Sequence, residues 1–281
     1  MFQTARHFVT GIGTAIAEKN LTLIAAGVAF YGMLALFPGL AAVIAIWGLL
    51  SDPHILLEQL QLVDSILPAE VTRLVESQLN ALMNTSGDKL GWAGIISTMV
   101  AIWSARSGVA ALMLGLNAIH GRDNRSSLRH YLTALALTMA LLGVSVVTLS
   151  AVVIVPIVLA IVPLGPMTSL LIEGFRWAAA IFVLLAGLAV VYRFGPNNRG
   201  ERMKWVTPGA GMAVILWAVA SYGFSFYLSN FANYNEVYGS IGAAIAMLMW
   251  LFISAFLILL GAVVNLQLSS RHSLNRALTQ G

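Results

Sequence analysis

Long runs of hydrophobic residues alternate with short polar connections along most of the chain. A helix needs about 20 predominantly apolar residues to cross the hydrocarbon core of a bilayer. Six runs meet this requirement, and they cover residues 21–50, 92–119, 131–162, 170–192, 205–231 and 240–268. Several are longer than a crossing needs, which predicts tilted or kinked helices, with Pro38 and Pro156 as the kink sites. The pattern therefore predicts an all-α polytopic membrane protein with six transmembrane helices.

Basic residues predict the orientation of these helices in the membrane. Lys and Arg residues in short loops are retained on the cytoplasmic side. With an even number of spans, the two chain ends and the even-numbered connections share one side. Of the 15 Lys and Arg residues, 11 lie in these places, namely in residues 1–20, 120–130, 193–204 and 269–281. Both ends of the chain are therefore predicted to be cytoplasmic.

Two segments outside the spans show the apolar spacing of helices. Residues 1–20 predict an interfacial helix on the cytoplasmic side. Its apolar positions are Phe8, Val9, Ile12 and Ile16. Residues 51–91 predict an external amphipathic segment, in which residues 69–83 form a helix against the membrane; a space-filling cap and a gate are both open interpretations. The apolar positions of that helix are Val71, Leu74, Val75, Leu79 and Leu82. No polar linker divides the runs, so residues 1–281 are predicted to form a single transmembrane domain.

Composition supports the membrane assignment and limits the partners. Charged residues make up 9% of the chain and hydrophobic residues 59%, whereas an ordinary soluble domain is roughly 25% charged. The apolar surface must therefore face lipid. The formal net charge of +4 does not indicate a nucleic-acid partner, because the positive charges lie along the predicted cytoplasmic rim, where they attract anionic headgroups. The sequence contains no recognisable nucleic-acid-binding module.

The sequence patterns of catalytic and metal sites are missing. The chain has no Cys, which excludes disulfides, thiolate metal sites and Cys nucleophiles. Its five His residues show no metal-binding spacing such as His-x-x-x-His. Neither a Gly-x-Ser-x-Gly elbow nor a phosphate-binding Gly-rich Lys motif is present. We therefore expect a protein that is not an enzyme and that holds no metal or cofactor.

Arg106 is a charged residue near the middle of the second predicted span. A charge at that depth costs about 2.5–3.5 kcal/mol on insertion scales, so such a residue normally faces the bundle interior or a wet cavity. No acidic residue lies deep in a span to pair with it. We interpret Arg106 as a substrate contact for a phosphate or carboxylate; the alternative is a structural tie to helix carbonyls or to another polar residue. Its small neighbours leave room for a cavity: Ser104, Ala105, Ser107 and Gly108.

Four further residues are lesser candidates for substrate binding: Asn117, Tyr31, Asn265 and Tyr238. Interhelical hydrogen bonding is the alternative role for the two asparagines and Tyr31. Tyr238 lies at the end of a span, where aromatic residues form a belt at the membrane interface, so anchoring is its alternative role.

Small residues in the spans predict close contacts between helices. Gly209 follows Pro208, and this pair is predicted to open the fifth span. Gly209 and Gly211 would both let neighbouring helices approach closely, because glycine has no side chain to keep them apart.

Several sequence segments resemble the YihY/BrkB family of bacterial inner-membrane proteins, once mislabelled as ribonuclease BN. The likeness extends over roughly residues 25–268, and its most specific segment is 234–243. The segments are AFYGMLALFP (29–38), AALMLGLNAIH (110–120), YRFGPN (192–197), YNEVYGSIGA (234–243), Trp250 and LGAVVN (260–265). The resemblance implies a multi-pass protein of the bacterial inner membrane. For some family members it also implies transport or export of lipid-linked or other amphiphilic molecules.

The chain departs from the family pattern at two places. The family commonly has Leu-Pro-Asn where this chain has Gly195-Pro196-Asn197, and often a glutamate where this chain has Val263. The second difference removes a carboxylate and so weakens any mechanism that needs an acid there. The ribonuclease label finds no support in these residues.

These observations leave three functional hypotheses. The leading one is the movement of an amphiphilic, anionic substrate such as a lipid or a lipid-linked precursor. The alternative is a non-catalytic scaffold or assembly factor for cell-envelope machinery, and the third is a small-solute or ion exchanger. The expected partners are the lipid bilayer and a lipid substrate, with a homo-oligomer or an envelope protein partner left open. No ATP-binding motif is present, so energy would come from a gradient, a partner or the substrate itself.

Overall fold

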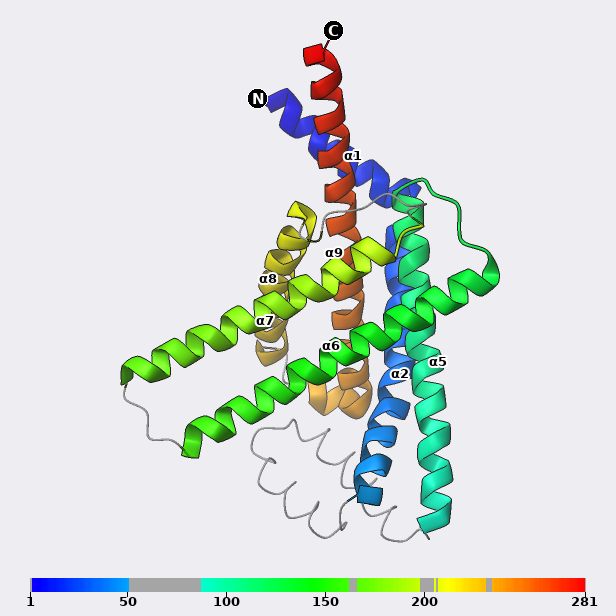
Figure 1. The fold of residues 1–281 in the computed structure, drawn as a ribbon, viewed down its shortest axis with the longest axis vertical. Coiled ribbons are helices and arrows are strands. Elements are labelled where there is room, and N and C mark those ends of the chain that lie inside the picture. The colour runs from blue at the N-terminus through cyan, green and yellow to red at the C-terminus, as the bar shows by residue number, and fades with distance from the viewer. Residues whose placement is uncertain are drawn as a thin grey trace. The chain divides into compact units, whose positions relative to one another are not determined.

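The computed structural model describes residues 2–50, 87–161, 166–197, 205, 207–230 and 234–280. Within these ranges the chain forms seven α-helices and no strand. They are α1 (Phe2–Glu18), α2 (Leu21–Leu50), α5 (Gly87–Ile119), α6 (Ser127–Ile161), α7 (Pro166–Phe194), α8 (Pro208–Asn230) and α9 (Tyr234–Gln280) (Figure 1). The prediction of an all-α protein is confirmed.

Five helical segments are long and apolar enough to cross a membrane. They are Leu21–Ala42, Gly94–Ile119, Ser127–Ser145, Pro208–Leu228 and Ala244–Ser269. A shorter apolar segment of α7, Ala178–Phe194, falls within the predicted fourth run and just beyond its end. These counts refer to the described ranges. The chain is therefore a polytopic membrane protein, as its hydrophobic runs predict.

The two predicted segments outside the spans are described only in part. Residues 51–86 lie outside the described residues, so the helix expected at 69–83 stays a prediction, and residues 87–91 form the first turns of α5. Residues 2–18 form α1, which ends where Asn20 adopts a left-handed backbone conformation with φ of 51°. Pro38 lies inside α2 without ending it.

The structure divides into two compact units. Unit 1 comprises Met1–Val28, Val109–Phe224 and Phe252–Gly281, and unit 2 comprises Ala29–Gly108 and Ser225–Leu251. Helices α2, α5, α8 and α9 each contribute residues to both units.

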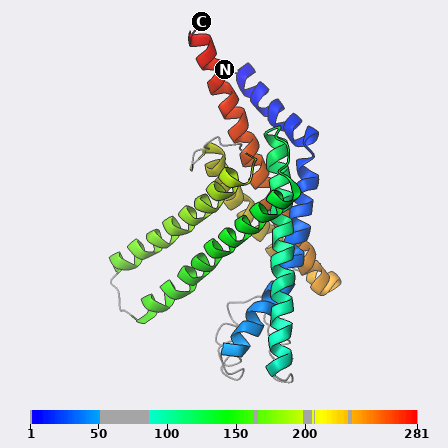
Figure 2. The same ribbon diagram turned by 45° about the vertical axis from the view of Figure 1, so that its right-hand side comes forward.

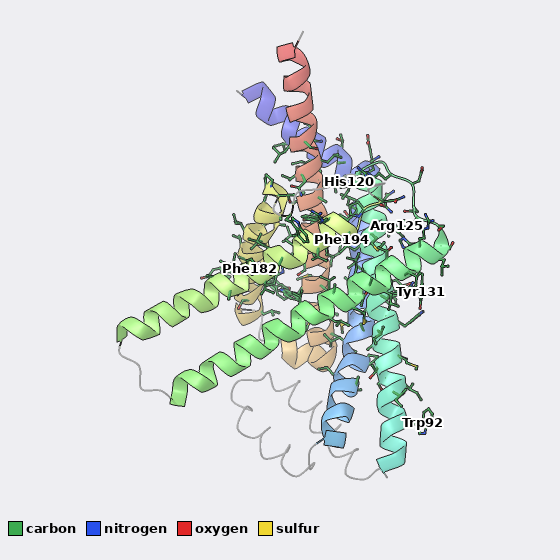
Figure 3. All side chains as sticks on the ribbon, in the orientation of Figure 1. Trp92, His120, Arg125, Tyr131, Phe182 and Phe194 are labelled. Atoms are coloured by element: carbon green, nitrogen blue, oxygen red, sulfur yellow. The ribbon has the colours of Figure 1, made fainter. Side chains whose placement is uncertain are left out.

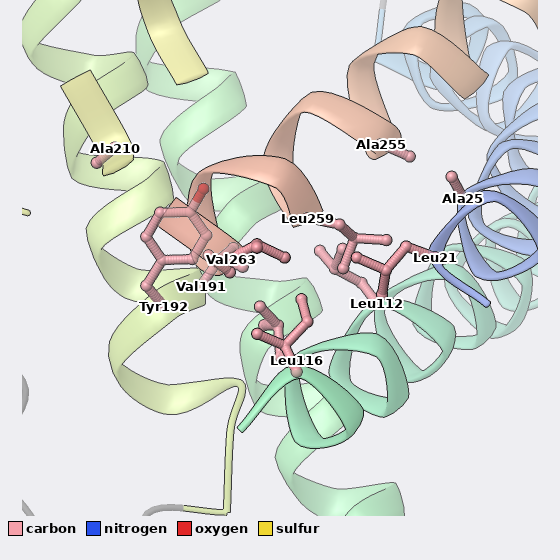
Figure 4. Close-up of a cluster of buried hydrophobic side chains, with 12 residues drawn as sticks. Leu21, Ala25, Leu112, Leu116, Val191, Tyr192, Ala210, Ala255, Leu259 and Val263 are labelled. Carbon is pink, nitrogen blue, oxygen red and sulfur yellow. The ribbon is translucent and has the colours of Figure 1, made fainter. Parts of the chain in front are cut away.

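Unit 1 has a hydrophobic core built from five helices. Large buried side chains in it include Leu21 from α2, Leu116 from α5 and Leu259 from α9, and α7 and α8 supply the rest (Figure 4). Ile12 and Ile16 of α1 pack against this core. Part of the apolar face of α1 is therefore used in packing within the unit.

Helices α6 and α7 of unit 1 lie side by side as an antiparallel pair (Figure 2). A second small cluster of buried side chains joins α5 to α6, and Val190 of α7 packs against it. The buried members of that cluster are Met113, Ala134 and Leu137. Large exposed apolar side chains such as Phe182 of α7 (Figure 3) are expected of a surface that meets lipid tails rather than water.

Within unit 2, α2 contacts both α9 and α5. A Cβ atom at Gly32 of α2 would lie 3.5 Å from a methyl group of Leu251 of α9. One at Gly39 would lie 4.0 Å from Cβ of Ala101 in α5. Small residues thus let α2 approach its neighbours closely, which is how helices associate in lipid, where burial of apolar surface gives little driving force.

Candidate functional site

Arg106 lies near the centre of the membrane-spanning part of α5. It is twelve residues from Gly94 and thirteen from Ile119, which bound that segment. Its side chain is half-buried, and its Nη2 donates a hydrogen bond to Oγ of Ser107 at 3.3 Å. The Ser107 hydroxyl in turn donates to the carbonyl oxygen of Trp103 at 2.8 Å. The charge is therefore connected to the backbone of its own helix through a neighbouring hydroxyl.

The surroundings of Arg106 on α5 are small and polar. Ser104 is fully buried and Ser107 is nearly so. A guanidinium carries five N–H donors in a planar fork, and one of them is used on Ser107. The arrangement is chemically suited to hold a phosphate or carboxylate group. Whether Arg106 binds a substrate stays a prediction.

The other candidate residues fall in different parts of the structure. Tyr31 lies on α2 in unit 2, half-buried, and its ring meets the ring of Phe30 edge-on at 5.5 Å. Tyr238 lies on α9, and its side chain is outside the described residues. Asn117 and Asn265 belong to unit 1, where the structure gives each of them a clear set of hydrogen bonds.

The end of α5 is closed by hydrogen bonds of a Schellman motif. Gly121 has φ of 60°, a left-handed conformation that glycine adopts without steric cost. Its N–H donates to the carbonyl of Ala118 at 3.2 Å, and the N–H of Arg122 donates to the carbonyl of Asn117 at 2.9 Å. These two bonds satisfy carbonyls that the helix itself leaves unpaired. The helix end is thus fixed, and with it the direction in which the next residues leave.

Asn117 connects this helix end to the end of α7. It is 1% exposed, and its Oδ1 accepts a hydrogen bond from the backbone N–H of Asn197 at 2.8 Å. Its Nδ2 donates to Oδ1 of Asn124 at 2.9 Å. Two further bonds run between the same segments: Arg122 Nη1 donates to the Asn197 carbonyl at 3.0 Å, and Asn197 Nδ2 donates to the Asp123 carbonyl at 3.0 Å.

Arg125 caps the end of α7 (Figure 3). Its Nη1 donates to the carbonyl of Gly195 at 2.8 Å. Its Nη2 donates to the carbonyls of Phe194 at 3.1 Å and Pro196 at 2.7 Å. A helix leaves its last carbonyls unpaired and carries partial negative charge there, so a cation is stabilising at this place. Burial lowers the pKa of the Arg125 guanidinium through desolvation, but an arginine stays charged at neutral pH.

Asn265 makes the corresponding connection between α9 and the start of α8. Its Oδ1 accepts a hydrogen bond from the N–H of Gly209 at 2.7 Å, and its Nδ2 donates to Oγ1 of Thr207 at 2.8 Å. Thr207 precedes Pro208, the first residue of α8, and its Oγ1 also accepts from the N–H of Ala210 at 3.3 Å. Thr followed by Pro is a favourable way to begin a helix. The prediction that Pro208 and Gly209 open this span is confirmed.

Three helices approach each other closely beside Asn265. A Cβ atom at Gly209 would overlap the carbonyl oxygen of Gly261 in α9, and one at Gly261 would overlap the Tyr192 hydroxyl of α7. That hydroxyl donates to the carbonyl of Ile258 at 2.7 Å. Close approach at Gly209 is therefore confirmed. The same expectation at Gly211 is wrong, because in the described part of the chain no neighbouring helix comes within 4 Å of a Cβ placed there.

The two departures from the family pattern both fit this packing. A Cβ atom at Gly195 would lie 2.6 Å from Cδ1 of Leu116 and would also overlap the carbonyl oxygen of Val191. Glycine thus lets the end of α7 rest against α5. Val263 is fully buried in the hydrophobic core of unit 1, where a valine needs no polar partner.

Sequence reasoning missed several residues of these connections. Arg122 and Arg125 were interpreted only as signals of orientation, and Asn124, Thr207 and Asn197 were given no structural role. The targets of both arginines are backbone carbonyls, which carry no residue identity and so leave no signal in the sequence. Thr207 could have been found, because Thr before Pro at the start of an apolar run is a helix-start signal.

Taken together, the helices and their polar connections define a polytopic all-α membrane protein. Within the parts that the structure describes, no group of three or more His, Cys, Asp or Glu residues is arranged to hold a metal ion. The family model described as virulence factor BrkB matches residues 12–280. The chain belongs to this family, and the resemblance seen in the sequence is confirmed.

Relatives are found in several bacteria. The chain is 33% identical over 258 residues to the ribonuclease-like protein YfkH of Bacillus subtilis, and the match covers 89% of this chain and 90% of that protein. It is 36% identical over 105 residues to UPF0761 membrane proteins of Xanthomonas campestris and Xanthomonas axonopodis, covering 35% of this chain. That match spans 24% of the length of each Xanthomonas protein. No solved structure matches the chain significantly.

Proposed function

We propose that the chain moves an amphiphilic, anionic substrate, such as a lipid or a lipid-linked precursor, across or out of the bilayer without a catalytic step. The observation that supports this proposal is Arg106, a charged residue near the centre of a membrane-spanning helix segment. Such a charge costs about 2.5–3.5 kcal/mol to insert. A residue that costs this much to bury is expected to be kept for a function.

The chemistry of Arg106 indicates the class of substrate. A guanidinium binds phosphate and carboxylate through two parallel N–H bonds, which an ammonium cannot do. The hydroxyl of Ser107, which Arg106 contacts, adds a polar oxygen beside the guanidinium. Long apolar helices on either side of this polar point suit a substrate with an acyl or polyprenyl tail.

The proposal can be tested in proteoliposomes that contain fluorescent phosphatidylglycerol, with dithionite quenching as the measure of lipid movement. Arg106→Gln should insert and fold as well as the wild type, because it removes a costly charge, and should abolish movement. Arg106→Lys should recover only part of the rate. Arg129→Gln is the matched control, since Arg129 is exposed at the start of α6, and it should move lipid normally.

Two results would count against transport. One is a folded Arg106→Gln variant that moves lipid at the wild-type rate. The other combines two findings. The wild-type protein moves no phospholipid or lipid-linked precursor in liposomes, and in cells its deletion disrupts an envelope assembly that the Arg106→Gln variant restores. The second result would favour the scaffold hypothesis, in which the charge of Arg106 is dispensable.

We further propose that the chain resides in the inner membrane of a bacterium with both ends in the cytoplasm. The distribution of basic residues supports this orientation. The chain has no Cys, so a single introduced Cys is its only thiol. A membrane-impermeant maleimide added to whole cells should label Ser65→Cys and should not label Arg129→Cys or Arg199→Cys. External labelling at either arginine position would overturn the orientation.

A further inference from the structure

Arg193, Phe194 and Trp205 form a cluster at the end of α7, which we call the Trp205 platform. The guanidinium carbon of Arg193 lies 4.4 Å from the centre of the Trp205 ring and 5.8 Å from that of Phe194. The two rings meet edge-on, with centroids 6.2 Å apart and planes at 74°. Trp205 is 54% exposed and Phe194 46%. The platform is therefore a charged group resting on exposed aromatic surface.

The cation–π contact of Arg193 is compatible with an anionic ligand. A guanidinium held over an aromatic ring by cation–π attraction keeps its positive charge and its planar fork of N–H donors. Such a fork is suited to two oxygens of a phosphate. The ring contact also restricts the side chain, so less rotational freedom remains to be lost on binding.

The position of the platform suggests where the ligand comes from. Phe194 is the last residue of the apolar segment Ala178–Phe194, so the platform lies at the depth of the lipid headgroups. Exposed Trp and Phe side chains are favourable at this depth, where one side meets acyl chains and the other meets water. An anion near a helix C-terminus would ordinarily be repelled by the helix dipole. Here Arg125 offsets that repulsion, because it already caps the carbonyls at this end.

We infer that the Trp205 platform binds the phosphate of an anionic phospholipid, such as phosphatidylglycerol, with an acyl chain against Phe194 and Trp205. The inference is independent of the proposed transport, since a scaffold could hold such a lipid equally well. The platform and Arg106 are also at different depths along the helices that carry them. Loss of lipid binding at one place can therefore be separated from loss of transport at the other.

The chain offers a matched control for charge. Arg125 is unsuitable, because its three bonds to the end of α7 make it part of the fold. Arg129 is exposed on the first turn of α6, and Arg129→Gln removes the same charge. If the site depends on the contact between Arg193 and Trp205, loss of Arg193 should weaken lipid binding more than loss of Arg129. If basic residues attract anionic lipid only in general, the two losses should weaken binding equally.

The test uses the purified full-length protein in neutral detergent and dioctanoyl phosphatidylglycerol as the probe. Native mass spectrometry gives the dissociation constant of the tightest-bound lipid. Arg193→Gln should weaken binding about tenfold, the effect of losing a charge-assisted hydrogen-bonded contact. Trp205→Leu should weaken it by a similar factor and Arg193→Lys by less. Arg129→Gln should change it less than about twofold, because exposed charges at a distance are screened by salt. The unfolding temperature of each variant confirms that it is folded.

Three outcomes would overturn the inference. Equal weakening by Arg193→Gln and Arg129→Gln would show general charge attraction. Equal binding of dioctanoyl phosphatidylcholine would show that the anionic headgroup is not recognised. Displacement of the lipid by inorganic phosphate at the concentration at which the lipid itself binds would assign the platform to a free phosphate instead.

Discussion

Helix α5 uses its polar side chains in two ways at two depths. Near the middle of its span, Arg106 contacts Ser107, the next residue in the chain. At the end of the helix, Asn117 bonds to the backbone of Asn197, 80 residues away. Shortly after the helix, Arg125 bonds to three carbonyls about as distant in sequence.

The difference follows from what a helix leaves unpaired. Inside a helix every backbone N–H is already bonded and each C=O already accepts one bond. A polar side chain there depends on the second lone pair of a nearby carbonyl, as Ser107 does with Trp103, or on other side chains, water or a ligand. At its ends a helix leaves several N–H and C=O groups open. Polar residues near the ends of α5, α7 and α8 find these groups and hold the fold together, whereas a polar residue at mid-span is a better candidate for function.

The largest effect should come from Asn117→Ala. This change leaves the half-buried N–H of Asn197 without its acceptor and the exposed side chain of Asn124 without its donor, and it empties a buried position. We expect a loss of about 3 kcal/mol in the free energy of unfolding, because two hydrogen bonds and the packing of a buried side chain are lost together. Unfolding by SDS in mixed micelles would measure it. Asn124→Ala, which breaks only one of these bonds, should cost much less; equal losses would contradict the assignment.

Gly209→Ala should have the next largest effect. The added methyl group would overlap the Gly261 carbonyl and crowd Asn265, and overpacking of this kind costs about 2 kcal/mol. Gly211→Ala on the same helix meets open space and serves as the control. We expect it to be neutral or slightly stabilising in the same assay, since alanine is the better helix former. If both variants were neutral, the close contact between α8 and α9 would be wrong.

Arg125→Gln should be less damaging, because Arg125 is only partly buried. Loss of the charged bonds to the end of α7 should cost about 1.5 kcal/mol. Arg129→Gln removes the same charge from an exposed position and should leave the free energy of unfolding within about 0.5 kcal/mol of wild type. Similar effects at the two positions would indicate that net charge, and not the cap on α7, sets the stability.

The smallest effect on stability is expected for Arg106→Gln. The change removes a charge that is costly to insert, while glutamine can still bond to a neighbouring hydroxyl. The free energy of unfolding should stay within about 0.5 kcal/mol of wild type or rise. A loss as large as that of Asn117→Ala would make Arg106 a structural residue and would remove the contrast between the two depths of α5.

The fold could be predicted from the sequence further than the site could. Hydrophobic runs located the helices, because lipid demands about 20 apolar residues per crossing, and the predicted end of α5 at residue 119 agrees with the structure. Helix α9 continues to Gln280, well past the predicted end of its run, because hydropathy does not report a helix that continues outside the apolar layer.

The polar connections could be predicted only in part. Asn117 and Asn265 were recognised as polar residues of the spans, with interhelical hydrogen bonding as one of two roles, but their partners could not be named. Their main-chain partners, at Asn197 and Gly209, are set by how the helices pack. The substrate-binding role of Arg106, Tyr31 and the other candidates stays a prediction.

The bond between Asn117 and Asn197 also has a consequence for biogenesis. Because 80 residues separate the two, a ribosome working at about 5–20 residues per second makes the second partner roughly 4–16 s after the first. Throughout that interval Asn117 has been synthesised, but its Oδ1 still lacks the N–H of Asn197. Its place at a helix end, beside a polar loop, lets water hydrate the amide while α6 and α7 are still being inserted. A polar group that waits for a late partner is tolerable at this border, and the order of synthesis therefore favours placing such ties at the ends of helices.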